Sequence, residues 1–255
     1  MVFNAAMSAK ILLVTGASRG IGAATALRAA EDGWDVAVHF ARDERAAEDV
    51  AAGVRGRGRR ACVVRADVAD ESAVEAMFGE VDTVLGPLGG LVNNAGIVDV
   101  ATRLEDMSAA RIRRLLDVNV VGAFVCAREA VRRMARRRGG AGGVIVNLSS
   151  AAARLASPGI YLDYSASKAA IDNFTWGLAR EVAEDGIRVN GVRPGIIATE
   201  IHASSGMLER AQAAVASIPL QRMGDSDEVA RAIVFLLSDA SSYTTGATLD
   251  VTGGR

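Results

Sequence analysis

The chain has 255 residues, half of them hydrophobic, and its 29 Lys and Arg residues nearly balance 30 Asp and Glu residues. A chain of this size and apolarity can bury one large core. We therefore expect a single domain over residues 9–255, preceded by an unstructured extension over residues 1–8, with Met7 as an alternative start. The balanced charge provides no general attraction to nucleic acid or to an anionic membrane, and we predict neither as a partner.

The two cysteines, Cys62 and Cys126, lie in apolar segments, and two histidines cannot complete a cysteine-based zinc cluster. We expect both thiols to be buried as small hydrophobes, and we predict no metal site. The N-terminus lacks the basic and then apolar layout of a secretory signal, and no apolar run approaches the ~20 residues that span a bilayer. These features predict a cytoplasmic protein.

Short apolar runs alternate with segments of helical periodicity along the chain. The predicted strands are residues 10–15, 35–40, 61–65, 90–93, 144–148, 188–192 and 248–251. The predicted helices are residues 20–33, 43–56, 70–85, 108–138, 161–185 and 225–238. Strands this apolar are covered on both faces, and connections of helix length imply right-handed crossovers. We expect an α/β fold with a doubly wound, Rossmann-like parallel sheet of about seven strands, helices on both faces, and a ligand outside the carboxyl ends of the strands.

The first of these strand ends carries the glycine-rich turn TGASRGIG over residues 15–22. Gly16 allows a tight turn, Gly20 lets the backbone approach a pyrophosphate, and Gly22 lets helix and strand pack closely. A glycine-rich turn without any ligand is the alternative interpretation. The order of strand, turn and helix favours a dinucleotide site.

The end of the second strand bears on which dinucleotide is bound. An NAD site places an acidic side chain on the ribose about 20 residues after the glycines. This chain has His39, Phe40, Ala41 and Arg42 there, without a carboxylate. Arg42 and Arg19 can pair with a 2′-phosphate, so we predict NADP(H) rather than NAD(H). In the alternative, Arg42 only faces solvent and discrimination is slight.

Tyr164 and Lys168 are spaced four residues apart in a helical segment, so both side chains project from one face. A phenol with a pKa near about 10 is a poor base at neutral pH. An ammonium within about 4–6 Å can lower such a pKa by about 1–3 units, which predicts a proton relay. This spacing is also common on solvated helix faces.

Two serines follow the predicted strand at residues 144–148, at the same edge of the sheet. A serine hydroxyl there can donate to a substrate oxygen as negative charge develops on it. Ser149 and Ser150 point to opposite faces of a strand, so only one of them can face the substrate. Alignment from Tyr164 favours Ser150, although the interval to Tyr164 contains an apparent extension over residues 154–162.

Together these motifs resemble those of the short-chain dehydrogenase/reductase family, over residues 10–255. The motifs are residues 15–22 (TGASRGIG), Asp67-Val68, residues 93–96 (NNAG), Asn119, Ser149-Ser150, residues 164–168 (YSASK) and residues 194–199 (PGIIAT). The resemblance implies metal-independent hydride transfer between NADP(H) and a carbonyl or secondary alcohol.

The resemblance also implies a role for each catalytic residue. Tyr164 would be the general acid and base, and Ser150 would hold the substrate oxygen. Lys168 would bind the nicotinamide ribose, and Asn119 would hold a water that extends the proton relay. The residues expected at the cofactor are Gly16, Ser18, Arg19, Gly20, Ile21, Gly22, Arg42, Asp67, Val68, Asn93, Ala95, Gly96, Tyr164, Lys168, Pro194, Gly195, Ile197 and Thr199.

The resemblance further implies a homotetramer, with the helices near residues 108–138 and 161–185 and the last strand at its interfaces. The extension before Tyr164 and a lid over residues 200–207 are similar to those of sugar dehydrogenases and of 3-oxoacyl-carrier-protein reductases, between which we do not choose. His202 in this region is either a substrate contact or solvated. Tyr161 lacks a lysine four residues later and is interpreted as a loop or packing residue. A non-catalytic NADP(H) sensor or scaffold is the alternative function.

Five arginines within residues 132–138 can be interpreted as a nucleic-acid stripe or as a solvated helix end. We favour the solvated end, because cations suit the carboxyl end of a helix. Phe174 and Trp176, on the helix of Tyr164, are expected to pack against a neighbour or another subunit.

Overall fold

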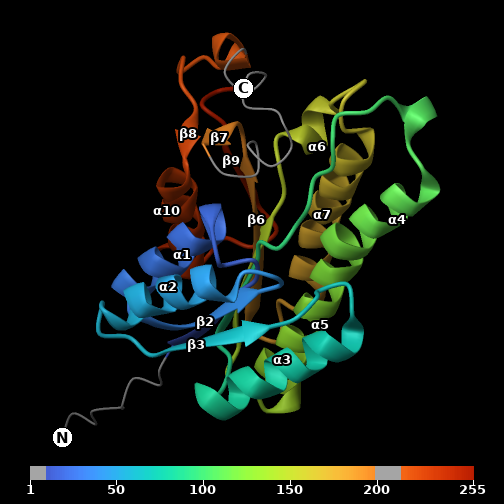
Figure 1. Cartoon of the computed structure of the whole chain (residues 1–255). Coiled ribbons are helices and arrows are strands. Elements are labelled where there is room, and N and C mark those ends of the chain that lie inside the picture. Colours follow the sequence, from blue (N-terminus) through green and yellow to red (C-terminus); the bar gives the residue numbers. More distant parts are fainter. Residues whose placement is uncertain (1–9, 199–213) are drawn as a thin grey trace, which may run out of the picture.

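The computed structural model describes residues 10–198 and 214–255, so the predicted extension over residues 1–8 lies outside the described residues. The described residues form a parallel sheet with helices on both faces, as Figure 1 shows. Its seven strands are β1 (Lys10–Val14), β2 (Trp34–Phe40), β3 (Ala61–Arg65), β4 (Gly90–Asn93), β5 (Gly143–Leu148), β6 (Ile187–Pro194) and β9 (Thr248–Val251). The predicted Rossmann-like sheet is therefore confirmed.

The strand order is β3-β2-β1-β4-β5-β6-β9, with every neighbouring pair parallel. The chain runs outward from β1 to β3 and then returns to build the other half from β4. In doubly wound sheets the ligand crevice lies at the carboxyl ends of the strands beside such a reversal, which here falls between β1 and β4. A separate parallel pair, β7 (Ile197–Ala198) with β8 (Gly224–Asp225), was not predicted, because two-residue strands have no measurable periodicity.

The helices are divided between the two faces of the sheet (Figure 1). Helices α1 (Gly20–Glu31), α2 (Glu44–Arg55) and α10 (Ser226–Leu237) bury one apolar cluster against the sheet. Helices α3 (Glu71–Val84), α5 (Gly122–Met134) and α7 (Leu162–Glu181) bury a second cluster on the opposite face. Two further helices, α4 (Ala109–Leu116) and the short α6 (Ala152–Leu155), lie in the connections that lead to α5 and α7.

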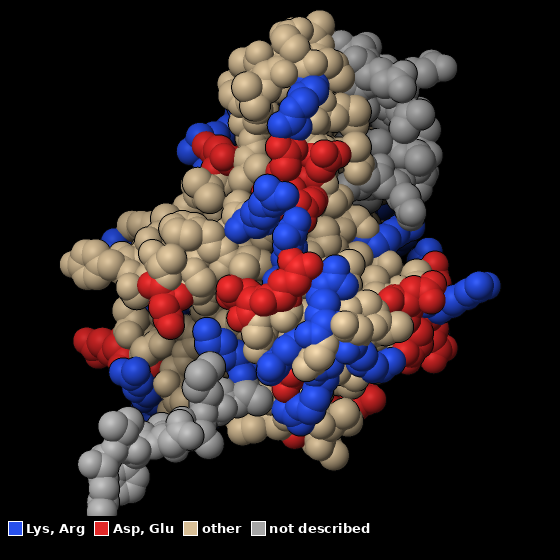
Figure 2. Space-filling model, turned by 90° about the vertical axis from the view of Figure 1, so that its left-hand side faces the viewer, with Lys and Arg blue, Asp and Glu red and all other residues tan. Residues whose placement is uncertain are grey.

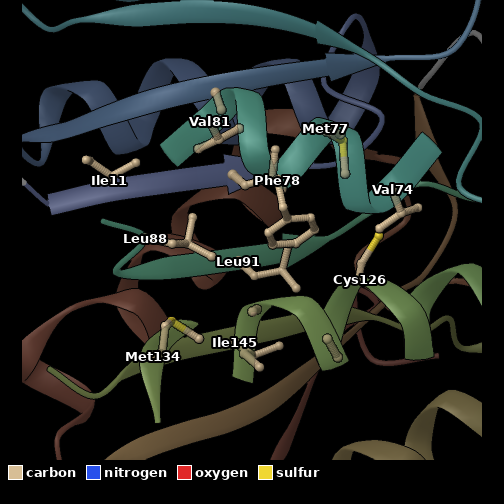
Figure 3. Packing of buried hydrophobic residues seen from close by; sticks show 14 of the residues in the cluster. Ile11, Val74, Met77, Phe78, Val81, Leu88, Leu91, Cys126, Met134 and Ile145 are labelled. Atoms are coloured by element: carbon tan, nitrogen blue, oxygen red, sulfur yellow. The ribbon is translucent and has the colours of Figure 1, made fainter. Parts of the chain in front are cut away.

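Figure 3 shows the second cluster, in which Phe78 of α3 packs over Leu91 of β4. Both cysteines are buried as predicted: Cys126 of α5 lies in this view, and Cys62 lies in β3. Burial raises the pKa of the Cys62 thiol to about 11 and that of Cys126 to about 12. Both thiols are therefore protonated at neutral pH and pack as small apolar groups.

The helix predicted over residues 108–138 is interrupted. Helix α4 passes into a π-helical segment, Asp117–Val121, and α5 then ends at Met134 before a short 3-10 turn, Arg136–Arg138. Ala135 leaves the helical region with ψ 128°, which ends α5. The π segment contains Asn119, whose side chain bonds the backbone of Ile97 instead of facing solvent. Such single-turn π segments often occur at functional sites.

Charged side chains on the surface pair with one another. Figure 2 shows the face that carries α1, α2 and α10, where positive and negative side chains are interspersed. Arg28 of α1 bonds Asp227 of α10, and Arg231 bonds the same carboxylate. Within the described residues, no helix is long and apolar enough to cross a membrane.

Three of the five arginines within residues 132–138 also pair with acidic side chains. Arg132 and Arg133 both bond Glu129, at 2.7 and 2.9 Å, and Arg137 pairs with Asp185. These carboxylates neutralise much of the positive charge at the end of α5, which supports the interpretation as a solvated helix end.

Candidate active site

The glycine-rich turn leads from β1 into α1 with the backbone that the sequence predicted. Gly16 and Gly20 have positive φ angles of 63° and 56°, which residues with side chains rarely adopt. A Cβ on Gly22 would lie 2.3 Å from the carbonyl oxygen of Gly16, so only glycine fits there. Ser18 and Ile21, also expected at the cofactor, lie half-buried in the same turn.

Asn94 joins this turn to the end of β4. Its side-chain Nδ2 donates to the carbonyl oxygens of Thr15 and Gly16, at 2.9 and 3.0 Å. The Thr15 hydroxyl in turn accepts from the backbone N–H groups of Asn94 and Ala95, both at 3.0 Å. The two halves of the sheet are thereby fastened together at the crevice, where Ala95 also approaches Gly16 closely.

His39 fastens the turn on its other side. Its Nδ1 accepts from the Gly16 N–H at 2.9 Å, and its Nε2 lies 3.1 Å from the carbonyl oxygen of Ala66. These partners require a neutral imidazole with the proton on Nε2. Burial lowers the pKa of His39 to about 4, which keeps it neutral. His39 therefore connects the glycine turn with the residue that precedes Asp67.

The start of α1 fits a dinucleotide phosphate. Its first turn carries no acidic side chain, and the N-cap residue, Arg19, makes no side-chain capping bond. In contrast, Asp43, Asp70 and Ser108 cap the starts of α2, α3 and α4. The uncapped N–H groups of α1, next to the left-handed glycines, form the kind of helix N-terminus that binds a pyrophosphate.

The other residues expected at the cofactor lie along the same edge of the sheet. Arg42 follows β2 and is exposed, as is Asp67, which follows β3 and accepts from the Ala69 N–H. Val68 is buried beside Gly122, whose Cβ would lie 2.8 Å from the Val68 carbonyl oxygen. Pro194 ends β6 and is followed by Gly195 and by Ile197 of β7. Thr199, the predicted lid over residues 200–207 and His202 lie outside the described residues.

One of the expected cofactor residues has a different environment. The side chain of Asn93 is buried within the sheet, where Nδ2 donates to Asn147 Oδ1 and to the Ala123 carbonyl oxygen, both at 3.0 Å. Asn147 Nδ2 in turn donates to the hydroxyl of Thr175 on α7. The Asn93 side chain thus ties β4 to β5 and α5, and within NNAG it is the Asn94 side chain that reaches the glycine turn.

Four residues that the sequence assigned to catalysis come from three separate segments, the π segment, the end of β5 and α7, and converge beside this crevice. Lys168 of α7 is 5% exposed, and its Nζ donates to the Leu148 carbonyl oxygen at 2.7 Å. Asn119 of the π segment bonds Ser167 of α7, at 3.2 Å. A Cβ on Gly96 would lie 3.3 Å from Asn119 Oδ1 and 3.6 Å from Lys168 Nζ. Gly96, the last residue of NNAG, therefore packs closely against both side chains.

The two serines after β5 point in different directions, as expected for adjacent residues. The Ser149 hydroxyl is buried and donates to the Lys168 carbonyl oxygen at 3.0 Å. Ser150 is half-buried and lies within hydrogen-bonding reach of Tyr164. The geometry therefore places Ser150, the serine that the sequence favoured, beside the phenol.

The pKa of Tyr164 departs from the expected direction. Burial raises the pKa of this phenol, and the hydrogen bond with Ser150 offsets only part of that rise. Lys168 Nζ lies 5.8 Å from the centre of the Tyr164 ring, and burial lowers the pKa of this ammonium to about 8. The expected lowering by Lys168 fails here because desolvation of the phenolate outweighs the attraction of a distant and itself desolvated charge.

Sequence reasoning did not select His39 or Asn94, although both lie within segments that it discussed. A detectable signal existed for each: His39 is a polar residue inside a buried strand, and Asn94 adjoins a motif at a strand end. Among the described residues, no cluster of three or more His, Cys, Asp or Glu side chains is placed to hold a metal ion.

Comparison with known proteins identifies the family of the chain. A family model described as enoyl-(acyl carrier protein) reductase matches residues 16–255. The chain is 53% identical to an uncharacterized oxidoreductase, YgfF, of Escherichia coli K12, over 96% of the chain and 99% of the relative. It is 40% identical to a 3-oxoacyl-[acyl-carrier-protein] reductase, FabG, of Staphylococcus aureus Mu50, over 96% of the chain and 97% of the relative.

A solved structure agrees with these relatives. The crystal structure of a short-chain type dehydrogenase/reductase from Mycobacterium marinum superimposes with a TM-score of 0.90 at 38% identity, and the match covers 97% of this chain and 95% of that one. Because the family model matches most of the chain and these relatives align along nearly their whole length, the chain belongs to the short-chain dehydrogenase/reductase family of oxidoreductases. Members of this family transfer a hydride to or from a nicotinamide cofactor.

Proposed function

We propose that the protein is an NADP(H)-dependent alcohol dehydrogenase or carbonyl reductase in which Tyr164 transfers the proton. The observation that carries the proposal is the convergence of Tyr164, Ser150, Lys168 and Asn119 next to the glycine-rich turn. A sensor or scaffold needs the glycine turn but has no use for a proton relay.

Each residue has a role that suits its place. Ser150 holds the substrate oxygen, to which Tyr164 donates its proton in reduction and from which it takes the proton in oxidation. Lys168 Nζ donates to the Leu148 carbonyl oxygen and would bind the ribose hydroxyls of the cofactor, and Asn119 would hold a water that extends the relay. When bound, the nicotinamide supplies or accepts the hydride. The raised pKa of Tyr164 suits a group that begins reduction as an acid.

The test of this role is the Tyr164→Phe variant, which keeps the ring and removes the hydroxyl. We expect turnover to fall by on the order of 100-fold to 10,000-fold, the usual contribution of a general acid. Binding of NADPH, followed by its fluorescence, should be retained. Tyr243→Phe, at a fully exposed tyrosine, is the matched control and should behave like the wild type. Near-normal turnover of Tyr164→Phe would refute the assignment.

The preference for NADP(H) is supported by the surroundings of Arg42. The nearest following carboxylate, Asp43, accepts from the Ala46 N–H at 3.0 Å and caps α2. No acidic side chain ends β2, so a 2′-phosphate meets Arg42 without an opposing carboxylate from that strand. We expect a higher kcat/KM with NADPH than with NADH, and we expect Arg42→Ala to reduce this ratio. A preference for NADH would contradict the proposal.

The substrate class can be found by a screen of 3-oxoacyl thioesters, simple ketones and sugars, with loss of NADPH absorbance as the readout. The identity of 40% to a 3-oxoacyl-[acyl-carrier-protein] reductase makes the thioesters the first class to test, and sugars are the second. Activity on any class supports the enzyme. Tight NADPH binding with no turnover of any class would favour a cofactor sensor.

We also propose that the protein assembles as a homotetramer through α5 and α7. Phe124 of α5 and Phe174 of α7 stack with ring centres 3.8 Å apart, and Phe124 is 46% exposed. Trp176, two residues after Phe174 in α7, is 54% exposed. Exposed aromatic side chains are typical of subunit interfaces. Light scattering of the purified protein measures the assembly directly.

A further inference from the structure

Arg111 and Asp163 form a buried ion pair beside Tyr164, although 52 residues separate them in the chain. Arg111 Nε donates to Asp163 Oδ2 at 2.8 Å, and Nη2 lies 3.4 Å from Oδ1. The side chain of Arg111 is 10% exposed and that of Asp163 is 1% exposed. A pair this enclosed is held in one geometry, unlike the exposed pairs on the outer helices.

Arg111 also holds the connection between β4 and α4. Its Nη1 donates to the Val100 carbonyl oxygen and to the Thr102 hydroxyl, both at 2.8 Å. The Thr102 N–H in turn donates to the carbonyl oxygen of Ile160, at 3.0 Å. One guanidinium therefore binds together the segment after NNAG, the extension before α7 and the first turn of α7. These segments flank Tyr164.

Asp163 is hydrogen-bonded to the backbone of the next residue, Tyr164. Its Oδ1 accepts from the backbone N–H of Tyr164 at 2.9 Å, in the first turn of α7, where no side chain of the N-cap residue Tyr161 provides a capping bond. A carboxylate in this position is favoured by the helix dipole and satisfies an otherwise unpaired N–H. The position of the Tyr164 backbone thus depends on where Arg111 holds Asp163.

We propose that Arg111 is a positioning residue for the reaction: through Asp163 and residues 100–102 it fixes Tyr164 and the wall of the substrate pocket beside it. This inference rests on the proposed role of Tyr164. Arg111 itself touches neither the cofactor residues nor Ser150, so its effect is transmitted through the ion pair.

The pair also balances charge at the residue that precedes Tyr164. The charged and titratable groups around it are Tyr161 and Asp99, which face Arg111, and Ser150, Tyr161 and Lys168, which face Tyr164. Without Arg111, the Asp163 carboxylate stays buried with no cation of equal proximity. Its unbalanced charge disfavours the phenolate, so the pKa of Tyr164 rises.

The experiment compares Arg111→Met, Arg111→Lys, Asp163→Asn and the double variant Arg111→Met/Asp163→Asn. Arg114→Met, at an exposed arginine of the same helix, is the matched control. For Arg111→Met we expect kcat to fall on the order of 100-fold, as for other displaced catalytic groups, with the KM for NADPH unchanged. The pH midpoint of kcat should rise by about one unit. Arg111→Lys should recover only part of the activity, because lysine lacks the forked donor geometry.

The double variant separates position from charge. It removes both charges, so the pH midpoint should return toward the wild-type value while kcat stays low. A second readout does not require turnover: the chain has three tyrosines, and the phenolate absorbance that is lost in Tyr164→Phe reports the pKa of Tyr164 directly. The same difference titration in the Arg111→Met background should show the raised pKa.

The outcomes distinguish this inference from the proposed function. If Tyr164→Phe is active, the assignment of Tyr164 fails whatever Arg111 does. If Tyr164→Phe is inactive and Arg111→Met matches Arg114→Met in kcat, pH midpoint and phenolate titration, the role of Arg111 is wrong. If Arg111→Met does not fold, as judged by circular dichroism, Arg111→Lys decides the question: wild-type kcat and pH midpoint in that variant would overturn the proposal.

Discussion

Replacing His39 with asparagine tests how the glycine-rich turn is held between its neighbours. The imidazole is 1% exposed and bridges the Gly16 N–H and the Ala66 carbonyl oxygen. Its pKa is lowered by burial from 6.5 to about 4. An asparagine oxygen can still accept from Gly16, but the side chain is too short to reach Ala66 and does not titrate.

The pKa of His39 determines how stability depends on pH. Above pH 6.5 the imidazole is neutral in both the folded and the unfolded state, so its contribution is fully present. As the pH falls from 6.5 toward 4, the unfolded state binds a proton that the folded state does not, and stability is lost. The complete loss is about 3 kcal/mol, of which about 2 kcal/mol falls between pH 7.5 and pH 5.

The assay is urea unfolding followed by circular dichroism at several pH values and at one fixed protein concentration. Carboxylates titrate equally in the wild type and in His39→Asn, so the difference in unfolding free energy between them isolates the imidazole. We expect the advantage of the wild type to shrink by about 2 kcal/mol on going from pH 7.5 to pH 5. A difference that is the same at both pH values would refute a buried, neutral His39.

Three other changes test separate parts of the structure. Gly22→Ala places a Cβ 2.3 Å from the Gly16 carbonyl oxygen, so the turn must shift. We expect this variant to bind NADPH more weakly and to lose about 1–3 kcal/mol of unfolding free energy. The control Gly79→Ala, where a Cβ meets nothing within 4 Å, should change neither property. Arg193→Met removes a buried guanidinium from its two carboxylate partners and should cost about 3–5 kcal/mol in urea unfolding; an unchanged midpoint would contradict this. Phe124→Asp should reduce the molecular mass in solution without loss of secondary structure, and an intact tetramer would place the interface elsewhere.

The order of the strands and helices could be read from the sequence because each signal is local. Apolar runs flanked by glycine turns identify buried parallel strands, and the spacing of helical residues identifies the crossovers between them. The predicted helix over residues 108–138 shows the limit of this approach. At its interruption Asn119 bonds the backbone of Ile97, a contact between different elements that leaves no trace in the periodicity.

The candidate site divides in the same way. The sequence by itself determined the candidate residues of the site, since the glycine turn, the serine pair and the spacing of Tyr164 and Lys168 are each formed by residues that are close together in the chain. Only the tertiary structure decided what surrounds them: the burial of the Ser149 hydroxyl against the Lys168 carbonyl oxygen, the hydrogen bond of His39 with Gly16, and the pairing of Arg111 with Asp163. It also reversed the expected direction of the Tyr164 pKa. Burial and charge pairing depend on atoms that are distant in the chain, and spacing along a sequence carries no measure of either.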